Sequence, residues 1–298
     1  MNERIHYTHC PVCGAANIVS VLKAKYHTVS GEIFEVVQCG TCSLRFTQDV
    51  PAQDFIGPYY KSEDYISHSN TSKGIINGLY HAVRKRTLAR KRKLVHQTTG
   101  LTRGRFLDVG SGTGAFVAAM REQGWEATGL EPDADARKVA LESYGVELKD
   151  IDQLYQLPPD SFDAITLWHV LEHVHDLHPY IQQLKNLLAS NGRLLIAVPN
   201  YTSYDAGVYK GDWAAYDVPR HLYHFSPASM RALMERNGLK VIAYKPMWYD
   251  SFYISLLSSR YRHGHTNWFS AAWNGMVSNI KAMGNVQRCS SVIYIISK

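Results

Sequence analysis

The stretch LDVGSGTGAF, residues 107–116, constrains the fold of this chain more than any other part of the sequence. Gly110, Gly112 and Gly114 lie where a buried strand turns into a helix, and because they lack side chains they let the backbone approach a ligand closely. The free N–H groups at the start of that helix favour a carboxylate or a phosphate. The stretch therefore predicts a ligand-binding loop after the first strand of an α/β domain.

The sequence after this loop alternates between strand and helix patterns. Strands are predicted at 105–110, 125–133, 146–148, 162–168, 193–200, 239–247 and 290–298, and helices at 114–124, 134–145 and 179–192. A further helix is expected to be capped by Ser226, with Pro227 at its first position. This alternation predicts a mostly parallel sheet with helices on both faces, over residues 105–298.

Four of the five cysteines lie in the first 42 residues, and we predict that residues 1–50 form a zinc-binding module. Cys10 and Cys13 form one C-x2-C pair, Cys39 and Cys42 form another, and tetrahedral zinc binds four such thiolates. The residues between the pairs alternate like two short strands, which is typical of a zinc ribbon whose metal is structural. The alternative is four reduced cysteines without a metal. The N-terminus lacks an apolar signal segment, so we expect a reducing, cytoplasmic location.

Residues 51–104 are predicted to be a linker followed by a basic helix. Positions 51–72 show little periodicity, whereas Ile75, Ile76, Leu79 and Val83 recur at helical spacing and predict a helix over 73–97. Its second half, RKRTLARKRK, has seven basic residues in ten, and the chain carries a net charge of +6. This stretch is either a solvated helix face or a contact with an anionic substrate, a membrane surface or RNA. No apolar run is long enough to predict a membrane span.

The glycine loop alone does not identify the cofactor, because with Ala115 it also satisfies the G-x-G-x-x-G/A fingerprint of dinucleotide sites. Glu131, after the second strand, could bind the ribose of either kind of cofactor. Two features separate the cases: Asp108, two positions before the first glycine, and the later stretches SFDAITLWHVLEHV and LASNGRLLIAVPN. With these motifs in this order, residues 105–247 and 290–298 resemble the class I S-adenosylmethionine-dependent methyltransferases, in the group related to the ubiquinone-biosynthesis enzymes.

The resemblance implies a Rossmann-like, seven-stranded sheet whose final strand is antiparallel, here preceded by the zinc ribbon. It implies that the glycine loop holds the methionine end of S-adenosylmethionine, that Glu131 binds the ribose hydroxyls, and that Asp150 or Ile151 borders the adenine. Trp168 and His169 would lie where the fourth strand opens onto the site. The cofactor-binding residues predicted in this way are Asp108, Gly110, Ser111, Gly112, Thr113, Gly114, Glu131, Asp150, Ile151, Trp168 and His169.

The segment WHVLEHVHDLHP, residues 168–179, contains H-x-x-E-H, a zinc-peptidase pattern. A peptidase needs this pattern inside a helix together with a distant third ligand, whereas here it follows a strand at the edge where open α/β sheets bind ligands. We therefore reject the peptidase interpretation. We expect His169 and His173 to lie one turn apart on one helix face, with one of them facing cofactor or substrate. His175 and His178 are expected at the surface.

An insertion at about 201–225 is rich in aromatic residues, which suits an apolar-walled site for an organic substrate. Its RHLYHFS stretch resembles a motif of the same methyltransferase group, and more distantly that of deoxysugar C-methyltransferases, which also carry a four-cysteine module. Pro219 and Arg220 depart from the latter motif, so an oxygen nucleophile is favoured. His221 is the candidate general base or substrate-orienting residue, unless it only ties the loop to the sheet; Tyr223 and His169 are weaker candidates.

A second insertion, at about 248–289, looks helical and aromatic, and it could cover the substrate, form a dimer face or bind an apolar partner. Cys289 is expected to be a small buried residue. The sequence thus predicts an S-adenosylmethionine-dependent O-methyltransferase acting on a small molecule, a saccharide or a lipid-like acceptor. The alternatives are an RNA methyltransferase, which would bind phosphates through the ribbon and the basic helix, and a binding module that holds the cofactor without turnover.

Overall fold

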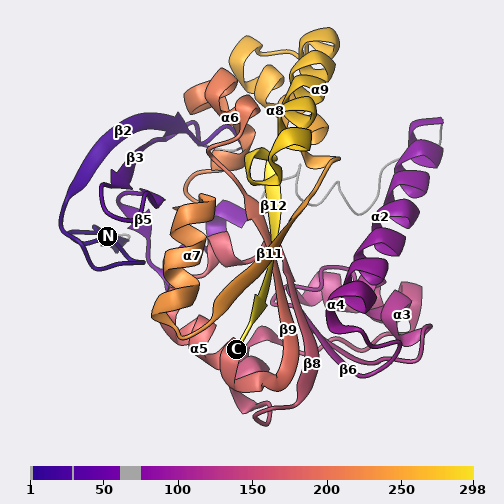
Figure 1. Cartoon of the computed structure of the whole chain (residues 1–298). Coiled ribbons are helices and arrows are strands. Elements are labelled where there is room, and N and C mark those ends of the chain that lie inside the picture. The colour runs from indigo at the N-terminus through magenta and orange to yellow at the C-terminus, as the bar shows by residue number, and fades with distance from the viewer. Residues whose placement is uncertain (1–2, 29, 61–74) are drawn as a thin grey trace. The chain divides into compact units, whose positions relative to one another are not determined.

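The computed structural model describes residues 3–28, 30–60 and 75–298, with no account of the side chains of 75–83 (Figure 1). The end of the predicted linker and the first residues of the predicted helix, 61–74, lie outside the described residues. The chain divides into two compact units, and each contains several chain segments. The ribbon unit contains Met1–Ile66, Leu171–His178 and Ala197–Tyr294; the glycine-loop unit contains Ser67–Val170, Pro179–Ile196 and Ile295–Lys298.

The boundaries of these units differ from the predicted boundaries at residues 50 and 104, because each unit combines several separate segments of the chain. The cysteine-rich segment belongs to the same unit as residues 197–294, and the basic helix belongs to the unit with the glycine loop. Segments that are far apart in the sequence therefore pack into the same unit.

The glycine-loop unit is built from strands and helices that alternate as predicted. Its elements are α2 (Ile75–Thr99), β6 (Arg105–Val109), α3 (Ala115–Arg121), β7 (Glu126–Leu130), α4 (Ala134–Tyr144), η3 (Ile151–Gln156) and β8 (Phe162–Trp168), with α5 (Leu177–Leu187) and β9 (Leu188–Pro199) shared with the ribbon unit. β6 pairs in parallel with β7 on one side and with β8 on the other. Phe106, Leu107 and Val109 of β6 are fully buried, as expected for a central parallel strand.

The main sheet has six strands in the order β11-β12-β9-β8-β6-β7, with β11 (Lys240–Pro246) and β12 (Ser291–Ser297) (Figure 1). The predicted count of seven is wrong by one, because residues 146–148 do not form a strand. The chain makes only an isolated parallel bridge there, between Leu130 and Lys149. Gly145 ends α4 in the left-handed conformation and Asp150 caps η3, so too few residues remain between them to extend a ladder.

The ribbon unit begins with a small antiparallel sheet in the order β10-β4-β3-β2. Its strands are β2 (Ile18–Lys25), β3 (Ile33–Cys39), β4 (Arg45–Thr47) and β10 (Tyr223–His224), and a separate pair joins β1 (Arg4–Ile5) to β5 (Val50–Pro51). The two strands predicted between the cysteine pairs are confirmed as β2 and β3. β10 comes from the predicted insertion at 201–225, and Tyr223 of β10 pairs with Phe46 of β4.

Besides β11 and parts of β9 and β12, this unit contains several helices. They are α6 (Tyr204–Tyr209), α7 (Pro227–Arg236), α8 (Asp250–His263) and α9 (Trp268–Gly284), with short 3-10 turns η1 (Gln53–Phe55), η2 (Gly57–Tyr60), η4 (Leu171–His173), η5 (Lys210–Asp212), η6 (Ala214–Tyr216) and η7 (Val286–Arg288). The predicted cap of α7 is confirmed, because Ser226 accepts a hydrogen bond from the backbone N–H of Ser229. No helix in the described part of the chain is long and apolar enough to cross a bilayer.

The aromatic residues of the 201–225 insertion mostly fill the core of the ribbon unit. Trp213 and Tyr216 are almost fully buried and belong to one apolar cluster with Phe34 of β3 and with Tyr26, which directly follows β2. The buried Asp205 carboxylate accepts hydrogen bonds from Trp213 and from two serines, Ser278 and Ser290. The expectation that these aromatic residues wall a substrate site is therefore wrong for Trp213 and Tyr216, because their rings pack against the ribbon strands.

Candidate functional site

A hollow of about 390 Å³ opens beside the glycine loop, at the carboxyl end of β6. Its lining residues all belong to the glycine-loop unit: Arg84, Thr87, Leu88, Lys91, Asp108, Gly110, Ser111, Gly112, Thr113, Ala115, Phe116 and Trp168. This volume lies within the range of pockets that hold small organic ligands and cofactors. The predicted ligand-binding loop therefore does border a cavity of suitable size.

Two glycines of the loop have different roles in its geometry. Both have positive φ, +72° for Gly110 and +53° for Gly112, a conformation that favours glycine. A Cβ at Gly110 would lie 2.4 Å from Cγ2 of Val170, so this glycine is required by packing. A Cβ at Gly112 would meet no atom within 4 Å, so this glycine leaves space at the wall of the hollow.

Two buried carboxyl groups lie around the loop. Asp108 accepts a hydrogen bond of 2.5 Å from Thr166, and burial raises its pKa to about 7. Glu131 accepts a hydrogen bond from the backbone N–H of Gly112, at 2.7 Å, and another from Asp133, at 3.1 Å; burial raises its pKa as well. Glu131 thus holds the loop in its turn, and its carboxylate is the nearest acidic group to the Gly112 backbone.

The basic helix α2 supplies residues that sequence reasoning did not assign to the site. Lys91 places its ammonium 4.1 Å from the centre of the Trp168 ring, and Arg84 donates a hydrogen bond to Thr113 at 3.1 Å. Both line the hollow, and α2 packs against α3 and β8 (Figure 1). The indole N–H of Trp168 is buried without a hydrogen-bond partner among the described residues. Only the dense basic pattern of 84–93 hinted at this role.

Not every predicted cofactor residue lines this hollow. Six do, namely Asp108, Gly110, Ser111, Gly112, Thr113 and Trp168, whereas Gly114, Glu131, Asp150, Ile151 and His169 are not among its lining residues. Asp150 instead forms an ion pair of 2.8 Å with Arg137 and caps η3. His169 has φ of +58°, the left-handed conformation, directly after β8.

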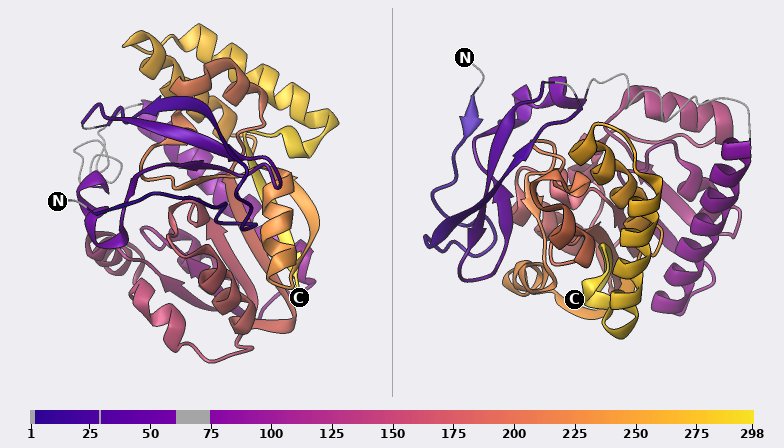
Figure 2. Two further views of the ribbon diagram at one scale, coloured as in Figure 1. Left: turned by 90° about the vertical axis from the view of Figure 1, so that its left-hand side faces the viewer. Right: turned by 90° about the horizontal axis from the view of Figure 1, so that it is seen from above.

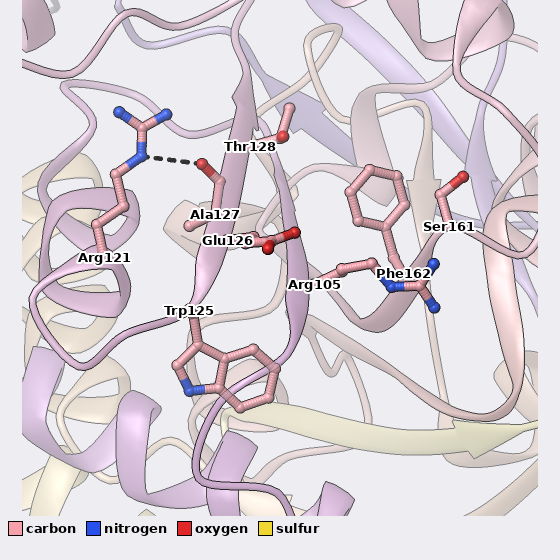
Figure 3. A pocket seen from close by; sticks show the side chains of 8 residues that line it. All are labelled: Arg105, Arg121, Trp125, Glu126, Ala127, Thr128, Ser161 and Phe162. Atoms are coloured by element: carbon pink, nitrogen blue, oxygen red, sulfur yellow. Dashed lines mark hydrogen bonds between the residues drawn. The ribbon is translucent and has the colours of Figure 1, made fainter.

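A larger hollow, of about 450 Å³, lies at the opposite ends of the same strands (Figure 3). Arg105, Glu126 and Phe162 line it at the beginnings of β6, β7 and β8, and Arg121 donates a hydrogen bond to the Ala127 carbonyl there. Ligands of open α/β sheets bind at the carboxyl ends of the strands. The smaller hollow, at those ends, is therefore the better candidate site despite its size.

The ribbon unit holds a separate cluster formed by Glu172, His173 and His221, whose ligand atoms lie within 4.8 Å of one another. One carboxylate and two imidazoles can bind a metal cation, and the same three groups can also transfer protons. Glu172 is fully buried, and burial together with the nearby His221 lowers the pKa of His173 to about 4. His173 is consequently neutral at pH 7.

The predicted candidate base, His221, is buried and firmly oriented. Its Nδ1 lies 2.8 Å from the Ala215 carbonyl, and because a carbonyl only accepts, this nitrogen carries the proton. In the neutral imidazole, Nε2 would then be the nitrogen with the lone pair. This Nε2 lies 3.8 Å from Asp217, too far for a hydrogen bond. Thr47 of β4 donates hydrogen bonds to the carbonyls of both His221 and Leu222. The small sheet thus supports this loop directly.

The other residues of this loop are engaged in the protein interior. The Tyr223 hydroxyl donates a hydrogen bond of 2.7 Å to the His175 carbonyl, and burial raises its pKa well above the usual value. His224 is buried against Thr47, and burial lowers its pKa well below the usual value. Arg220 forms a salt bridge of 2.6 Å with Asp217.

Two expectations for the H-x-x-E-H segment are wrong. His169 and His173 do not share a helix face, because His169 is left-handed and only Leu171–His173 forms a short 3-10 turn. His175 and His178 are half-buried rather than simply exposed, since their Nε2 atoms contact the Pro51 and Val12 carbonyls at 3.1 Å. The absence of an α-helix here agrees with the rejection of a peptidase site.

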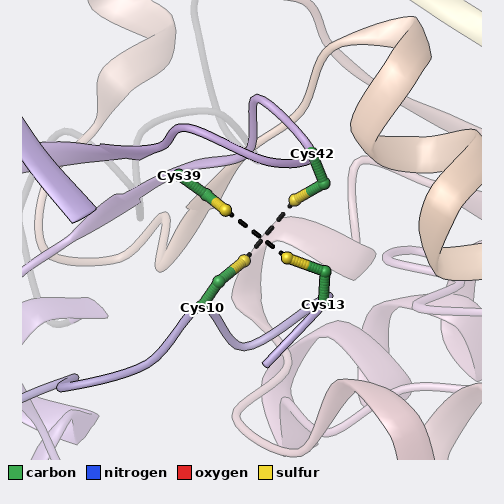
Figure 4. A group of neighbouring side chains, drawn as sticks. All are labelled: Cys10, Cys13, Cys39 and Cys42. Carbon is green, nitrogen blue, oxygen red and sulfur yellow. Dashed lines mark hydrogen bonds between the residues drawn. The ribbon is translucent and has the colours of Figure 1, made fainter. Parts of the chain in front are cut away.

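The four cysteines of the ribbon gather their sulfur atoms around one point (Figure 4). The Sγ atoms of Cys10 and Cys42 are 3.5 Å apart, and those of Cys13 and Cys39 are 3.4 Å apart. Tetrahedral zinc with Zn–S bonds of about 2.3 Å needs sulfurs separated by about 3.8 Å. The arrangement therefore fits a four-cysteine zinc site. Cys289 is buried elsewhere, as expected.

Comparisons with known proteins agree with this picture. Residues 80–244, more than half of the chain, match the family described as a methyltransferase domain. The ubiquinone biosynthesis O-methyltransferase of Xanthomonas euvesicatoria is 29% identical over 164 residues, which cover 50% of this chain and 68% of that protein. The human mitochondrial protein of the same description is 27% identical over 164 residues, covering 50% of this chain and only 44% of its own length.

A likeness in structure extends further along the chain. The 1,6-didemethyltoxoflavin-N1-methyltransferase of Burkholderia thailandensis, solved with bound 1,6-didemethyltoxoflavin and S-adenosylhomocysteine, aligns with a TM-score of 0.50 over 92% of this chain and 99% of that chain. The sequence identity is 13%, so the likeness shows a shared fold.

Proposed function

The chain belongs to the methyltransferase domain family, and on that premise we propose that it transfers a methyl group from S-adenosylmethionine to an oxygen atom of a small molecule, a saccharide or a lipid-like acceptor. The relatives with an O-methyltransferase description support the choice of oxygen, although the chain spans only 44% to 68% of the length of those compared above. The departure of Pro219 and Arg220 from the C-methyltransferase motif supports it independently.

The observation that carries the cofactor assignment is the space at Gly112. Its positive φ and the open position of its absent Cβ leave room for a ligand against bare backbone, beside a hollow of about 390 Å³. The buried indole N–H of Trp168 is a donor that a ligand atom could satisfy, because such groups rarely stay without a partner. These features fit a nucleoside-sized cofactor.

Individual residues would then have distinct duties. Lys91 and Arg84 bring positive charge to the hollow, which suits the carboxylate of the methionine end. Glu131 would exchange its hydrogen bond with Gly112 for the ribose hydroxyls, and Asp150 or Ile151 would border the adenine. Ser111, Thr113, Gly110 and Gly114 shape the loop, while Asp108 fixes its entry through Thr166.

Bound S-adenosylmethionine supplies a methyl group already activated by the sulfonium, so the protein mainly aligns donor and acceptor, worth about 7–11 kcal/mol of barrier. We assign His221 as the general base that takes the acceptor's proton at Nε2, since its Nδ1 proton is held by the Ala215 carbonyl. His173 stays neutral beside it because burial lowers its pKa to about 4, and the buried Glu172 is the acidic group of the same cluster. Tyr223, whose hydroxyl is bound to His175, is a weaker candidate, as is His169.

We further propose that zinc occupies the four-cysteine site and has a structural role. Only two residues separate Cys42 from β4, and β4 supports the His221 loop through Thr47. Zinc would therefore hold the base in place without taking part in the reaction.

The proposal is tested in two steps. Calorimetry with the purified chain should first give S-adenosylmethionine binding with one cofactor per chain. A screen of phenols, sugar nucleotides and lipid acids, read by the release of S-adenosylhomocysteine, should then find an acceptor whose hydroxyl becomes methylated. Cofactor binding without any turnover would favour the non-catalytic alternative, and absence of binding would contradict the proposal.

RNA remains the second candidate acceptor, because Lys85, Arg86 and Lys93 of α2 are exposed. Binding to a phosphate backbone weakens steeply as salt rises, with a slope set by the number of neutralised phosphates. Titration of the chain with labelled RNA at several salt concentrations separates the candidates. A steep slope with methyl incorporation into RNA would replace the small-molecule acceptor.

A further inference from the structure

The outer face of α9 carries a row of large apolar side chains that are open to solvent. The row consists of Phe269, Trp273, Met276, Ile280 and Met283, with exposed fractions of 84%, 55%, 40%, 52% and 68%. Trp268, at 70% exposed, extends it at the start of the helix. Contiguous apolar patches beyond roughly 300–600 Å² are uncommon on monomers and mark interaction sites.

The inner face of the same helix is made of small residues. Ala271, Gly275, Ser278 and Ala282 are buried, and α9 lies side by side with α8 (Figure 2). A Cβ at Gly275 would lie only 3.0 Å from Cα of Phe252, so the two helices touch closely. This contact fixes the rotation of α9 and turns its large side chains outward.

The spacing of the exposed row is that of a helix–helix seam. Successive members, from Phe269 to Met283, are separated by four, three, four and three residues. This is the a/d spacing of two heptads, which keeps apolar side chains on the seam with a second helix. The row spans about 21 Å at 1.5 Å per residue. The pattern thus predicts packing against another helix rather than against a flat surface.

The row also complements itself. In an antiparallel pair with a two-fold axis near Met276, Phe269 of one copy faces Met283 of the other, and Trp273 faces Ile280. Aromatic rings would then meet flexible thioether or branched side chains, and sulfur–aromatic contacts are favourable. A two-fold pairing of one surface with itself is the commonest way in which identical chains associate.

The charge of the helix fits the same occupant. Lys281 is the only charged residue of α9, and its ammonium lies 5.1 Å from the centre of the Tyr204 ring in the same unit. The positions that flank the row, Ser270, Ala272, Val277 and Asn279, are uncharged, so two copies would meet without repulsion along the seam. Helices that lie on membranes usually carry several Lys or Arg residues on their polar face, which α9 lacks.

We propose that α9 is a dimerisation helix and that its exposed row packs against the same row of a second copy of this chain. The three aromatic side chains alone expose roughly 400 Å², at 150–250 Å² for each full side chain. A stable interface buries about 800 Å² on each partner, so the row supplies an apolar centre of suitable size.

The oligomeric state of the full chain tests this inference. Sedimentation velocity should give a mass twice that of one chain, and Trp273→Glu, in the middle of the row, should weaken association at least a hundredfold. Leu141→Glu is the matched control, because Leu141 is exposed to 56% on α4 and lies outside the row; it should leave the dimer intact. Circular dichroism should find both variants folded, since both positions are exposed.

A cross-link tests the geometry separately. Cysteine at Met276 should form a disulfide between copies under mild oxidation, because the antiparallel pairing brings this position next to its own copy. Leu141→Cys should not, and the five native cysteines are buried. A single-chain mass at every accessible concentration would overturn the inference. So would a monomer that binds anionic vesicles through Trp273, which would assign the row to a lipid surface.

Discussion

The glycine-loop hollow and the histidine cluster both carry groups suited to binding or catalysis, and they are assembled differently. Four consecutive residues, Gly110–Thr113, form one side of the hollow, and most of its other lining residues lie within a few positions of that loop or on α2. The cluster at His221 instead depends on Glu172 and on Thr47, 174 residues away from His221. A local motif therefore builds the first region, and long-range pairing builds the second.

Removal of the metal from the ribbon should give the largest difference between the two regions, because it should affect the histidine cluster and not the glycine-loop hollow. Structural zinc contributes on the order of 10 kcal/mol, so a chelator or Cys42→Ser should unfold the small sheet and misplace the His221 loop. Turnover should vanish while cofactor affinity changes little. Metal analysis, thermal unfolding and calorimetry check this, with Cys289→Ser as the control that keeps its metal. Full metal content in Cys42→Ser would contradict the proposed site.

A valine at Gly112 should damage the other region. Its side chain would occupy the space left for the ligand, and we expect a loss of cofactor affinity on the order of a thousandfold, about 4 kcal/mol. Gly145→Val is the matched control, because Gly145 also has positive φ, +61°, with nothing within 4 Å of its Cβ, yet it ends α4 outside the hollow. Both variants share the backbone strain. Equal cofactor affinities in the two variants would show that the cofactor does not bind against the glycine loop.

The two regions should respond to pH with opposite signs. The folded chain holds the Asp108 proton up to about pH 7, whereas the unfolded chain releases it near pH 4, so this group lowers stability as pH rises, by up to about 4 kcal/mol. For His224 the depressed pKa means that the unfolded chain takes up a proton below about pH 6.5 and the folded chain does not, so stability falls as pH falls.

Denaturant unfolding between pH 4 and 7 checks both signs. Asp108→Asn should remove a slope that falls with pH, and His224→Gln should remove one that rises with pH. If both substitutions change the pH dependence of stability in the same direction, burial of these two groups is not its cause.

The smallest of the expected effects concerns catalysis itself. His221→Ala should lower kcat roughly 100-fold with cofactor binding kept, because a positioned base contributes about 10²–10⁴ in rate. Tyr223→Phe is the control on the same loop; it removes the hydroxyl that contacts the His175 carbonyl and the Tyr7 hydroxyl, and it should change kcat far less. Steady-state kinetics with the acceptor found in the screen decide between them. An unchanged rate in His221→Ala would leave that histidine a purely structural role.

The sequence by itself determined the parts that are encoded within a few consecutive residues. The glycine turn needs positive φ at fixed positions, each cysteine pair closes one tight turn, and Ser226 caps its own helix, so the pattern alone specifies each of these. The parallel strands were also predictable, because β6 and β8 are mostly apolar segments that alternate with helical patterns. The segment 146–148 is only three residues long, and its prediction as a strand was wrong.

Only the tertiary structure decided which partners the polar groups of the second region find. Every buried N–H and C=O must be paired, but any strand edge could offer a partner, so nothing in the local sequence selects β4 for β10 or Thr47 for the His221 carbonyl. The same holds for α2, whose basic pattern fits solvent as well as it fits the hollow, until packing against α3 and β8 brings Arg84 and Lys91 to the glycine loop. Local chemistry fixes conformation, whereas the choice among equivalent distant partners is made by the burial of the whole unit.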